Sequence, residues 1–165
     1  MRRQALEILE IIHENAGEAK IVGGSVRDFL LGSDVKDVDI ATTLKPEKIT
    51  DIFEEMNCKV IPTGIDFGTV TLIYKSKPYE VTTLRSDINP DGRHTKVAYT
   101  KDWQTDAMRR DFTFNALYMD CNQEIDDFFN GREDLEKGIV RFIGEAEERI
   151  KEDYLRILRM FRFHC

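Results

Sequence analysis

A pair of adjacent glycines followed by two closely spaced aspartates most constrains how this chain folds. The run Gly23-Gly24-Ser25-Val26-Arg27-Asp28 follows the apolar pair at 21–22, and Asp37-Val38-Asp39 comes about ten residues later. Because glycine has no Cβ, a glycine pair ahead of a helix lets backbone N–H groups approach a phosphate closely. The pattern therefore predicts a short strand, a phosphate-binding turn and a short helix that ends at residue 31.

The charged residues of this segment suit a nucleotide and a metal ion. Arg27 offers a planar guanidinium to phosphate oxygens. Asp37 and Asp39 lie two apart on a predicted strand, so both side chains should leave the same face. Neighbouring carboxylates repel unless a cation lies between them, and Mg²⁺ prefers oxygen ligands that it can share with substrate phosphates. An isolated Asp-x-Asp is more often the solvent face of an edge strand, and the upstream glycine turn is what favours a metal site.

Other nucleotide and metal motifs do not fit the chain. The glycines do not form the Gly-x-Gly-x-x-Gly pattern of dinucleotide-binding folds, and the Gly-Lys-Ser/Thr of a phosphate-binding loop is missing from the sequence. Three scattered cysteines, with no Cys-x-x-Cys spacing, and three equally scattered histidines argue against a zinc site. Any metal ion would therefore have to be held by carboxylates.

Hydrophobic periodicity predicts a mixture of helices and strands, which is the α+β class. Residues 86–102 are polar and contain Asn-Pro-Asp-Gly, so we expect a mobile loop there. A long amphipathic helix should begin near Ala146. The other helices are expected over 3–16, 26–31, 46–56 and 103–118, and the strands over 21–22, 38–41, 59–62, 69–74 and 79–84.

The last predicted helix carries charged side chains beside an apolar stripe. Asp153, Arg156, Arg159 and Arg162 repeat every third residue, so they form a slowly winding row. A row of solvated charges is the ordinary interpretation. Three arginines without a lysine, however, favour planar, two-pronged hydrogen bonding. An acceptor beside such donors has the groups needed to imitate the edge of a nucleic-acid base.

Taken in order, these motifs resemble those of the class II tRNA nucleotidyltransferase and bacterial poly(A) polymerase family, within the polymerase-β superfamily. Residues 23–42 look like motif A. Residues 109–117 are similar to motif B, which selects ribose over deoxyribose. Asp127, Gly131 and Arg141 have the spacing of motif C, an interdomain hinge, and residues 152–156 resemble the Glu-Asp-x-x-Arg motif, which acts as an amino-acid template for the incoming base.

The resemblance implies a polymerase-β-type nucleotidyltransferase head over residues 1–140 and the truncated start of an α-helical neck over residues 141–165. It also implies attack of an RNA 3′-hydroxyl on the α-phosphate of CTP or ATP, release of pyrophosphate and a two-metal mechanism with Mg²⁺. The partners are then the tRNA 3′ end, CTP and ATP. The implied catalytic and metal-binding residues are Asp37 and Asp39, and the implied nucleotide-binding residues are Gly24, Arg27, Arg110, Asp153, Arg156, Arg159 and Arg162.

Three further positions carry weaker expectations. Glu80, on the predicted strand 79–84, is the best-placed third metal ligand, although a structural or loop-anchoring role is favoured. Residues 85–102 match the family's flexible loop, with the basic cluster Arg93-His94-Thr95-Lys96, and this loop favours CCA or A addition over CC addition. Tyr154 stands where the family usually has Pro or Ala, and we attribute it to packing. For Arg109 and Asp111, a structural salt bridge and a place in a polar cleft remain equal alternatives.

Alternative functions remain open at this point. Bacterial poly(A) polymerases share these motifs, and an A-adding-only tRNA nucleotidyltransferase or a non-catalytic RNA-binding module could use the same fold. The net charge of −7 argues against a generic basic nucleic-acid binder but permits a local basic patch. Neither a signal segment nor an apolar run of about 18–20 residues is evident, so we expect a cytoplasmic protein without a membrane span. The apolar stripe near residue 165 suggests a truncated or partial chain, or else a naturally reduced protein that recruits a second chain.

Overall fold

The chain folds around a mixed β-sheet. The structure, a computed structural model, describes residues 3–88 and 96–164. Within these ranges the sheet has the strand order β3-β4-β5-β2-β1-β8-β9, with β2 and β5 parallel and the other neighbours antiparallel. The strands are β1 (Ala19–Val22), β2 (Asp39–Thr42), β3 (Lys59–Gly64), β4 (Thr69–Tyr74), β5 (Lys77–Thr83), β8 (Leu117–Met119) and β9 (Ile125–Asp127).

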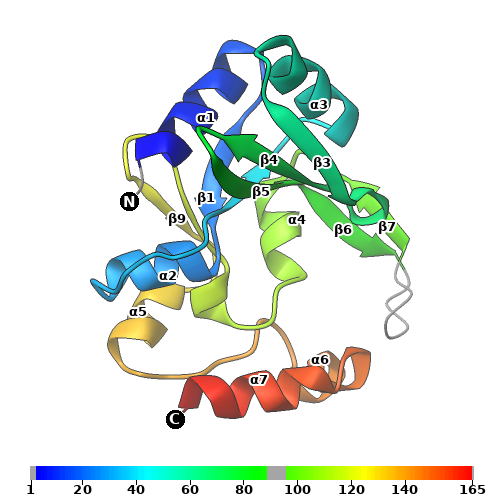
Figure 1. The fold of residues 1–165 in the computed structure, drawn as a ribbon. Coiled ribbons are helices and arrows are strands. Elements are labelled where there is room, and N and C mark those ends of the chain that lie inside the picture. The colour runs from blue at the N-terminus through cyan, green and yellow to red at the C-terminus, as the bar shows by residue number, and fades with distance from the viewer. Residues whose placement is uncertain (1–2, 89–95, 165) are drawn as a thin grey trace.

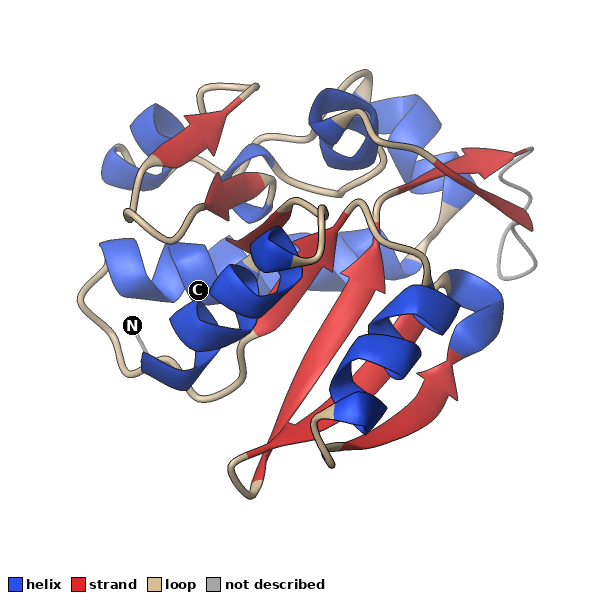
Figure 2. Cartoon of the chain, turned by 90° about the horizontal axis from the view of Figure 1, so that it is seen from above, coloured by secondary structure: helices blue, strands red, loops and turns tan. Residues whose placement is uncertain are grey.

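Helices cover the sheet and extend beyond it (Figure 1). They are α1 (Arg3–Glu14), α2 (Gly24–Leu30), α3 (Pro46–Glu55), α4 (Trp103–Met108), α5 (Gly131–Glu136), α6 (Ala146–Glu152) and α7 (Leu155–His164), with the 3₁₀ turns η1 (Ile65–Phe67) and η2 (Thr113–Asn115). Helices α1 and α3 lie at the top of the molecule in Figure 1, and α6 and α7 lie at the bottom, beyond α4 and α5. Helices and strands mix throughout, which confirms the predicted α+β class (Figure 2).

The strands bury different side chains on their two faces, because successive residues of a strand point in opposite directions. Ile21 and Ile40 belong to the larger core, which α1 and α3 cover with their apolar residues. Val22 and Ala41 belong to a second, smaller core that includes Ala107 of α4. Asp39 is two residues from Ala41, so the strand geometry directs its side chain to the face that carries this second core.

The helix predicted over residues 103–118 is wrong beyond Met108. The chain instead forms α4, a charged turn, η2 and strand β8, which pairs with β1. The Asp111 carboxylate accepts hydrogen bonds from the Phe112 amide (2.8 Å) and from the Asn115 side chain (3.1 Å). Such bonds compete with a helical backbone. The apolar residues at helical spacing therefore pack in an irregular segment.

The long helix predicted from Ala146 is interrupted at Asp153. Asp153 has extended backbone angles (φ −153°, ψ 105°) and separates α6 from α7. Its carboxylate accepts the amide N–H of Leu155 (2.9 Å), which is the role of a helix N-cap. The charged row therefore begins at a cap, and Arg156, Arg159 and Arg162 follow it on α7.

The loop predicted over residues 86–102 contains two paired strands within its described residues. Strands β6 (Arg85–Ile88) and β7 (Lys96–Tyr99) form an antiparallel pair, separate from the main sheet. Arg93, His94 and Thr95 of the predicted basic cluster lie outside the described residues. Along the described parts of the chain, we find no helix whose length and apolar character would let it cross a membrane.

Candidate active site

A cleft of about 420 Å³ brings together residues from both ends of the chain. Of the nine residues predicted for the site, all but Asp37 line it. Residues that sequence reasoning did not assign to the site, such as Asn115 and Phe163, also line it. The complete lining is Gly23, Gly24, Arg27, Asp39, Arg109, Arg110, Asp111, Asn115, Asp153, Arg156, Arg159, Arg162 and Phe163.

The cleft is strongly polar and carries more positive than negative charge. Six arginines and three aspartates line it, which leaves a formal charge of +3 in a chain of net charge −7. Arginine donors in a planar fork match phosphate and base edges. The local basic patch that the composition permitted is therefore present, and it suits a polyanionic ligand.

The glycine turn lies where β1 ends and α2 begins. Gly23 has a φ of 72°, which an L side chain adopts only with strain, and a Cβ there would lie 3.4 Å from an Arg110 guanidinium nitrogen. Gly24 is the first residue of α2, and both glycines line the cleft. The glycine turn therefore lies at the cleft between a strand and a short helix, as the sequence pattern predicted, and its phosphate-binding role stays a prediction.

Ser25 holds the acidic segment against α2. Its hydroxyl donates to the main-chain oxygen of Asp37 (2.9 Å) and accepts the amide N–H of Asp39 (3.2 Å). Asp37 lies in a bend before β2, so the prediction that both aspartates lie on the strand is wrong for Asp37. Both residues are nevertheless exposed on either side of buried Val38, so the expected alternation persists. Sequence reasoning missed this role of Ser25, which lies inside the motif.

Asp39 is surrounded by other acids. It is the register partner of Glu80 on the parallel strand β5. Desolvation by the surrounding protein, the charge of Glu80 and the charge of Asp37 raise the pKa of Asp39, and only Arg110 opposes them. This site disfavours an isolated carboxylate, and a bound cation would reverse that preference.

The carboxylates of this site suit a metal ion that is bound partly by the protein and partly by a substrate. Among residues 3–88 and 96–164, no three His, Cys, Asp or Glu side chains converge closely enough to hold a metal ion alone. Mg²⁺ is commonly bound by one or two carboxylates together with substrate phosphates. Asp37 and Asp39 therefore fit such an ion, while Glu80 stands beside them without completing a three-ligand group.

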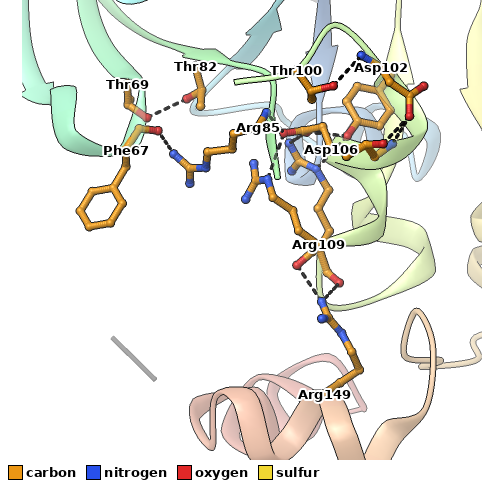
Figure 3. Close-up of polar contacts among 12 residues, drawn as sticks. Phe67, Thr69, Thr82, Arg85, Thr100, Asp102, Asp106, Arg109 and Arg149 are labelled. Carbon is orange, nitrogen blue, oxygen red and sulfur yellow. Dashed lines mark hydrogen bonds and ion pairs between the residues drawn. The ribbon is translucent and has the colours of Figure 1, made fainter. Parts of the chain in front are cut away.

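Asp106 organises the arginines at one wall of the cleft. Its side chain is 1% exposed and accepts from Arg109 Nε (3.0 Å), Arg110 Nη2 (3.2 Å), the Tyr118 hydroxyl (2.7 Å) and the Arg85 amide (3.1 Å). Figure 3 shows Arg109 reaching back to Asp106. Burial opposes ionisation of Asp106, but Arg110, Arg109 and these hydrogen bonds hold its pKa below the usual range. Sequence reasoning did not single out Asp106.

Residues 109–111 are held by the helices that follow them. Arg149 of α6 donates to the main-chain oxygens of Arg109 (2.7 Å) and Arg110 (2.8 Å), as the lower part of Figure 3 shows for Arg109. Arg159 of α7 donates through Nε to the Asp111 carboxylate (2.5 Å). Arg109 and Asp111 thus make salt bridges and also line the cleft, so both alternatives from the sequence hold at once.

The predicted base-contacting residues lie along α7 and at the residue that caps it. Arg156 donates to Glu152 (2.7 Å) and to the Arg149 main-chain oxygen (2.6 Å), so its guanidinium is fixed. Tyr154 is 70% exposed, so the described residues do not give it the packing role predicted from the sequence. Leu158 (67%) and Phe161 (58%) are also exposed, which makes the outer face of α7 apolar, as the stripe predicted.

The motif C residues form two linked anchors. Asp127 accepts the amide N–H groups of Gly131 (2.8 Å) and Arg132 (2.9 Å), and Arg141 pairs with Asp134 (3.0 Å). A Cβ on Gly131 would lie 2.2 Å from the Thr113 main-chain oxygen. Whether this segment acts as a hinge stays a prediction.

Comparisons with known proteins agree on one group. A family model described as the poly A polymerase head domain matches residues 19–141. The chain is 46% identical over 158 residues to CCA tRNA nucleotidyltransferase 1, mitochondrial, of Danio rerio, covering 95% of this chain and 37% of that protein. It is 44% identical over 162 residues to the CCA-adding enzyme of Staphylococcus haemolyticus, covering 97% and 40%. The chain thus spans about two fifths of these relatives.

Solved structures agree with the sequence comparisons. The Bacillus stearothermophilus CCA-adding enzyme in complex with CTP superimposes with a TM-score of 0.88 at 41% identity, covering 99% of this chain and 39% of that one. A tRNA nucleotidyltransferase complexed with a primer tRNA and an incoming ATP analogue gives 0.77 at 30% identity, covering 94% and 44%. The similarity thus covers nearly the whole chain.

Proposed function

The chain belongs to the poly A polymerase head-domain family, and we propose that it is the catalytic head of a CCA-adding tRNA nucleotidyltransferase. It would add CMP and AMP, from CTP and ATP, to the 3′ end of tRNA and release pyrophosphate. The observation that carries this proposal is the joint lining of one cleft by the glycine turn, Asp39, Arg110 and the Asp153-to-Arg162 row. Of the two relatives named above, one is by name a CCA tRNA nucleotidyltransferase and the other a CCA-adding enzyme.

In the proposed reaction, the protein mainly positions the reactants and neutralises charge, as is usual for phosphoryl-group chemistry. Gly24 and Arg27 would bind the triphosphate, and Arg110, fixed by Asp106 and Tyr118, would contact the sugar or phosphate. Asp153, Arg156, Arg159 and Arg162 would form the base pocket. Each of these binding residues is already bonded to a neighbour or to the cap, or lies at the cleft wall. Fewer side chains therefore have to lose conformational freedom when the nucleotide binds.

Asp37 and Asp39 would hold Mg²⁺ together with phosphate oxygens of the nucleotide. When bound, the ions would lower the pKa of the attacking 3′-hydroxyl and stabilise the negative charge that develops on pyrophosphate. The acidic surroundings of Asp39 support this assignment, because a cation relieves the repulsion among Asp37, Asp39 and Glu80. Glu80 as a direct ligand is the finer part of the proposal. The alternative is a structural role, in which Glu80 acts on Asp39 only through the repulsion between their charges.

The test is Mg²⁺-dependent labelling of a tRNA that lacks its 3′ end. Incorporation of C followed by A supports CCA addition. A tail of A residues alone supports poly(A) polymerase, the alternative that the family description keeps open. A single A, added only to a tRNA that ends in CC, supports an A-adding enzyme. A complete protein that incorporates neither nucleotide contradicts the proposal.

The cytoplasm stays the predicted location of the protein, although one relative is mitochondrial by name.

A further inference from the structure

Asn115 lies between two charged side chains of opposite sign. Its side-chain oxygen accepts from Arg27 Nη1 (2.9 Å), and its amide nitrogen donates to one Asp111 carboxylate oxygen (3.1 Å). The other Asp111 oxygen accepts from Arg159 Nε (2.5 Å). A continuous chain of hydrogen bonds therefore joins α2 to α7, and each of the four side chains belongs to a residue that lines the cleft.

The chemistry of this position selects an amide. Arg27 has donors alone and needs an acceptor, whereas the ionised Asp111 needs a donor. A neutral amide supplies both, and it can do so in one orientation, because a flipped amide would oppose donor to donor and acceptor to acceptor. Asn115 is 6% exposed, so water does not easily replace either bond. An alanine would supply neither bond, and an ionised carboxylate would repel Asp111.

We propose that Asn115 is a positioning residue that couples triphosphate binding to base selection. This inference rests on the proposed function, in which Arg27 contacts the triphosphate and Arg159 contacts the base. Asn115 acts directly on Arg27 and, through Asp111, on Arg159. A base that draws Arg159 into a productive position thereby also stabilises the orientation of Arg27 at the triphosphate.

The first experiment replaces Asn115 by alanine and measures steady-state incorporation of C and A into tRNA. We expect KM for both nucleotides to rise on the order of tenfold or more, because hydrogen bonds to charged groups are lost at both ends. The ratio of kcat/KM for the two nucleotides should also shift, since Arg159 loses its orientation. Thr113→Val is the matched control. It removes a buried bond to Asp134 (2.7 Å) from the same 3₁₀ turn, outside the chain of bonds, so thermal stability should fall without a change in either quantity.

The second experiment uses Asn115→Asp at several pH values. A protonated carboxyl has one donor and one acceptor, like the amide, whereas an ionised one repels Asp111. The facing charges are Arg27 and Asp28 of α2, Arg110 and Asp111 of the turn, and Arg159 of α7. Arg159 holds the pKa of Asp111 below the usual range against the effect of burial, so Asp111 stays ionised and its charge disfavours ionisation of a carboxyl introduced beside it. The KM of this variant, divided by that of the wild type in the same buffer, should therefore fall as the pH is lowered from about 8 to about 6.

The outcomes separate the two proposals. Wild-type KM values and an unchanged nucleotide ratio in Asn115→Ala would overturn the coupling role while leaving the proposed function intact. A pH-independent defect in Asn115→Asp would do the same. If the wild type incorporates neither nucleotide, the proposed function fails, and calorimetry with inorganic triphosphate still tests the Arg27 bond. Weaker binding by Asn115→Ala than by Thr113→Val then supports the positioning role, and equal binding overturns it.

Discussion

Asp39 of β2 and Glu80 of β5 face each other across a pair of parallel strands. Side chains of register partners leave the sheet on the same side, so two carboxylates share one small region beside the cleft. The charge of Glu80 is one of the causes, after desolvation by the surrounding protein, that raise the pKa of Asp39. The sheet therefore stores unfavourable interactions at the position where the proposed chemistry needs a cation.

We predict that Asp39→Asn strongly lowers nucleotide incorporation but stabilises the metal-free protein at neutral pH. Loss of a metal ligand should cost several kcal/mol of transition-state stabilisation, a fall of roughly a hundredfold or more. A carboxyl whose pKa is raised in the folded state loses stability as the pH rises through the interval between its unfolded and folded pKa values. The melting temperature without Mg²⁺, measured from pH 4 to pH 8 (about the range where carboxyls titrate), should therefore rise for this variant relative to wild type as the pH increases.

Glu80→Gln separates the two roles proposed for Glu80. If Glu80 is a metal ligand, the concentration of Mg²⁺ that gives half-maximal incorporation should rise by roughly tenfold, as seen when supporting groups of metal sites are lost. If Glu80 only repels Asp39, the same titration should stay within about twofold of wild type. A lower half-maximal concentration would contradict both roles.

Asp106→Asn should destabilise the fold by about 3–5 kcal/mol, because it leaves the half-buried Arg109 and Arg110 without their shared counter-charge. Urea unfolding at pH 7 measures this loss. The lowered pKa of Asp106 means that its stabilisation is present above its unfolded pKa and disappears as the pH falls through its folded value. Acid sensitivity should consequently weaken in the variant. Glu133→Gln, which breaks the exposed pair with Lys137, serves as the control and should cost less than about 0.5 kcal/mol.

Gly131→Ala should cost about 3 kcal/mol or more, at the upper end for overpacking. The added Cβ would meet main-chain atoms of Thr113 and Phe114 at 2.2 to 2.9 Å, and main chain cannot rotate away as a side chain can. Gly138→Ala is the comparison. That position has a φ of 65° but open space around it, so strain of about 1–2 kcal/mol is expected there. Equal losses in thermal unfolding would argue against the close approach of α5 to η2.

Arg149→Met should loosen α6 and α7 from the rest of the molecule. Its guanidinium bonds two main-chain oxygens and Glu152, each a charge-assisted bond worth about 1.5–3 kcal/mol. Hydrogen exchange of amides in α7 should therefore become faster, with little change in β1 or β4. Lys151→Met, on the same helix but exposed and paired with Glu147, should leave α7 exchange unchanged. Protection of α7 equal to wild type in Arg149→Met would refute the role of Arg149.

Local motifs were predictable from the sequence because their residues are close along the chain. Gly23, Gly24, Arg27 and Asp39 form the turn and the strand that their spacing predicted. The order of these motifs along the chain predicted the fold class and the protein family, and the comparisons confirm both. The individual roles of the site residues stay predictions.

Elements shaped by distant contacts were not predictable in the same way. Phe112 and Asn115 repeat at helical spacing, but the Phe112 amide and the Asn115 side chain donate to the Asp111 carboxylate instead. That carboxylate is in turn bonded by Arg159, which lies far along the chain. The break between α6 and α7 occurs where Asp153 accepts a capping hydrogen bond from the Leu155 amide. The apolar stripe continues through this point, so it predicted one unbroken helix. Asp106 also has local partners, because Arg109 and Arg110 follow it at helical spacing. Its bonds to the Arg85 amide and the Tyr118 hydroxyl come from other elements, which the sequence pattern does not reveal. The bonds of Arg149 to the main-chain oxygens of residues 109 and 110 are equally distant along the chain.

The parallel pairing of β2 with β5 has a consequence for the order of assembly. Strand β2 cannot pair with β5 until α3, β3 and β4, which lie between them in the sequence, have been synthesised. The arginines of α7 are synthesised later still. Non-local pairing of this kind slows folding, and synthesis proceeds from the N-terminus. A nascent chain therefore exposes the glycine turn and both aspartates well before the cleft is complete. Under the proposed function, nucleotide selection begins only once α7 has docked.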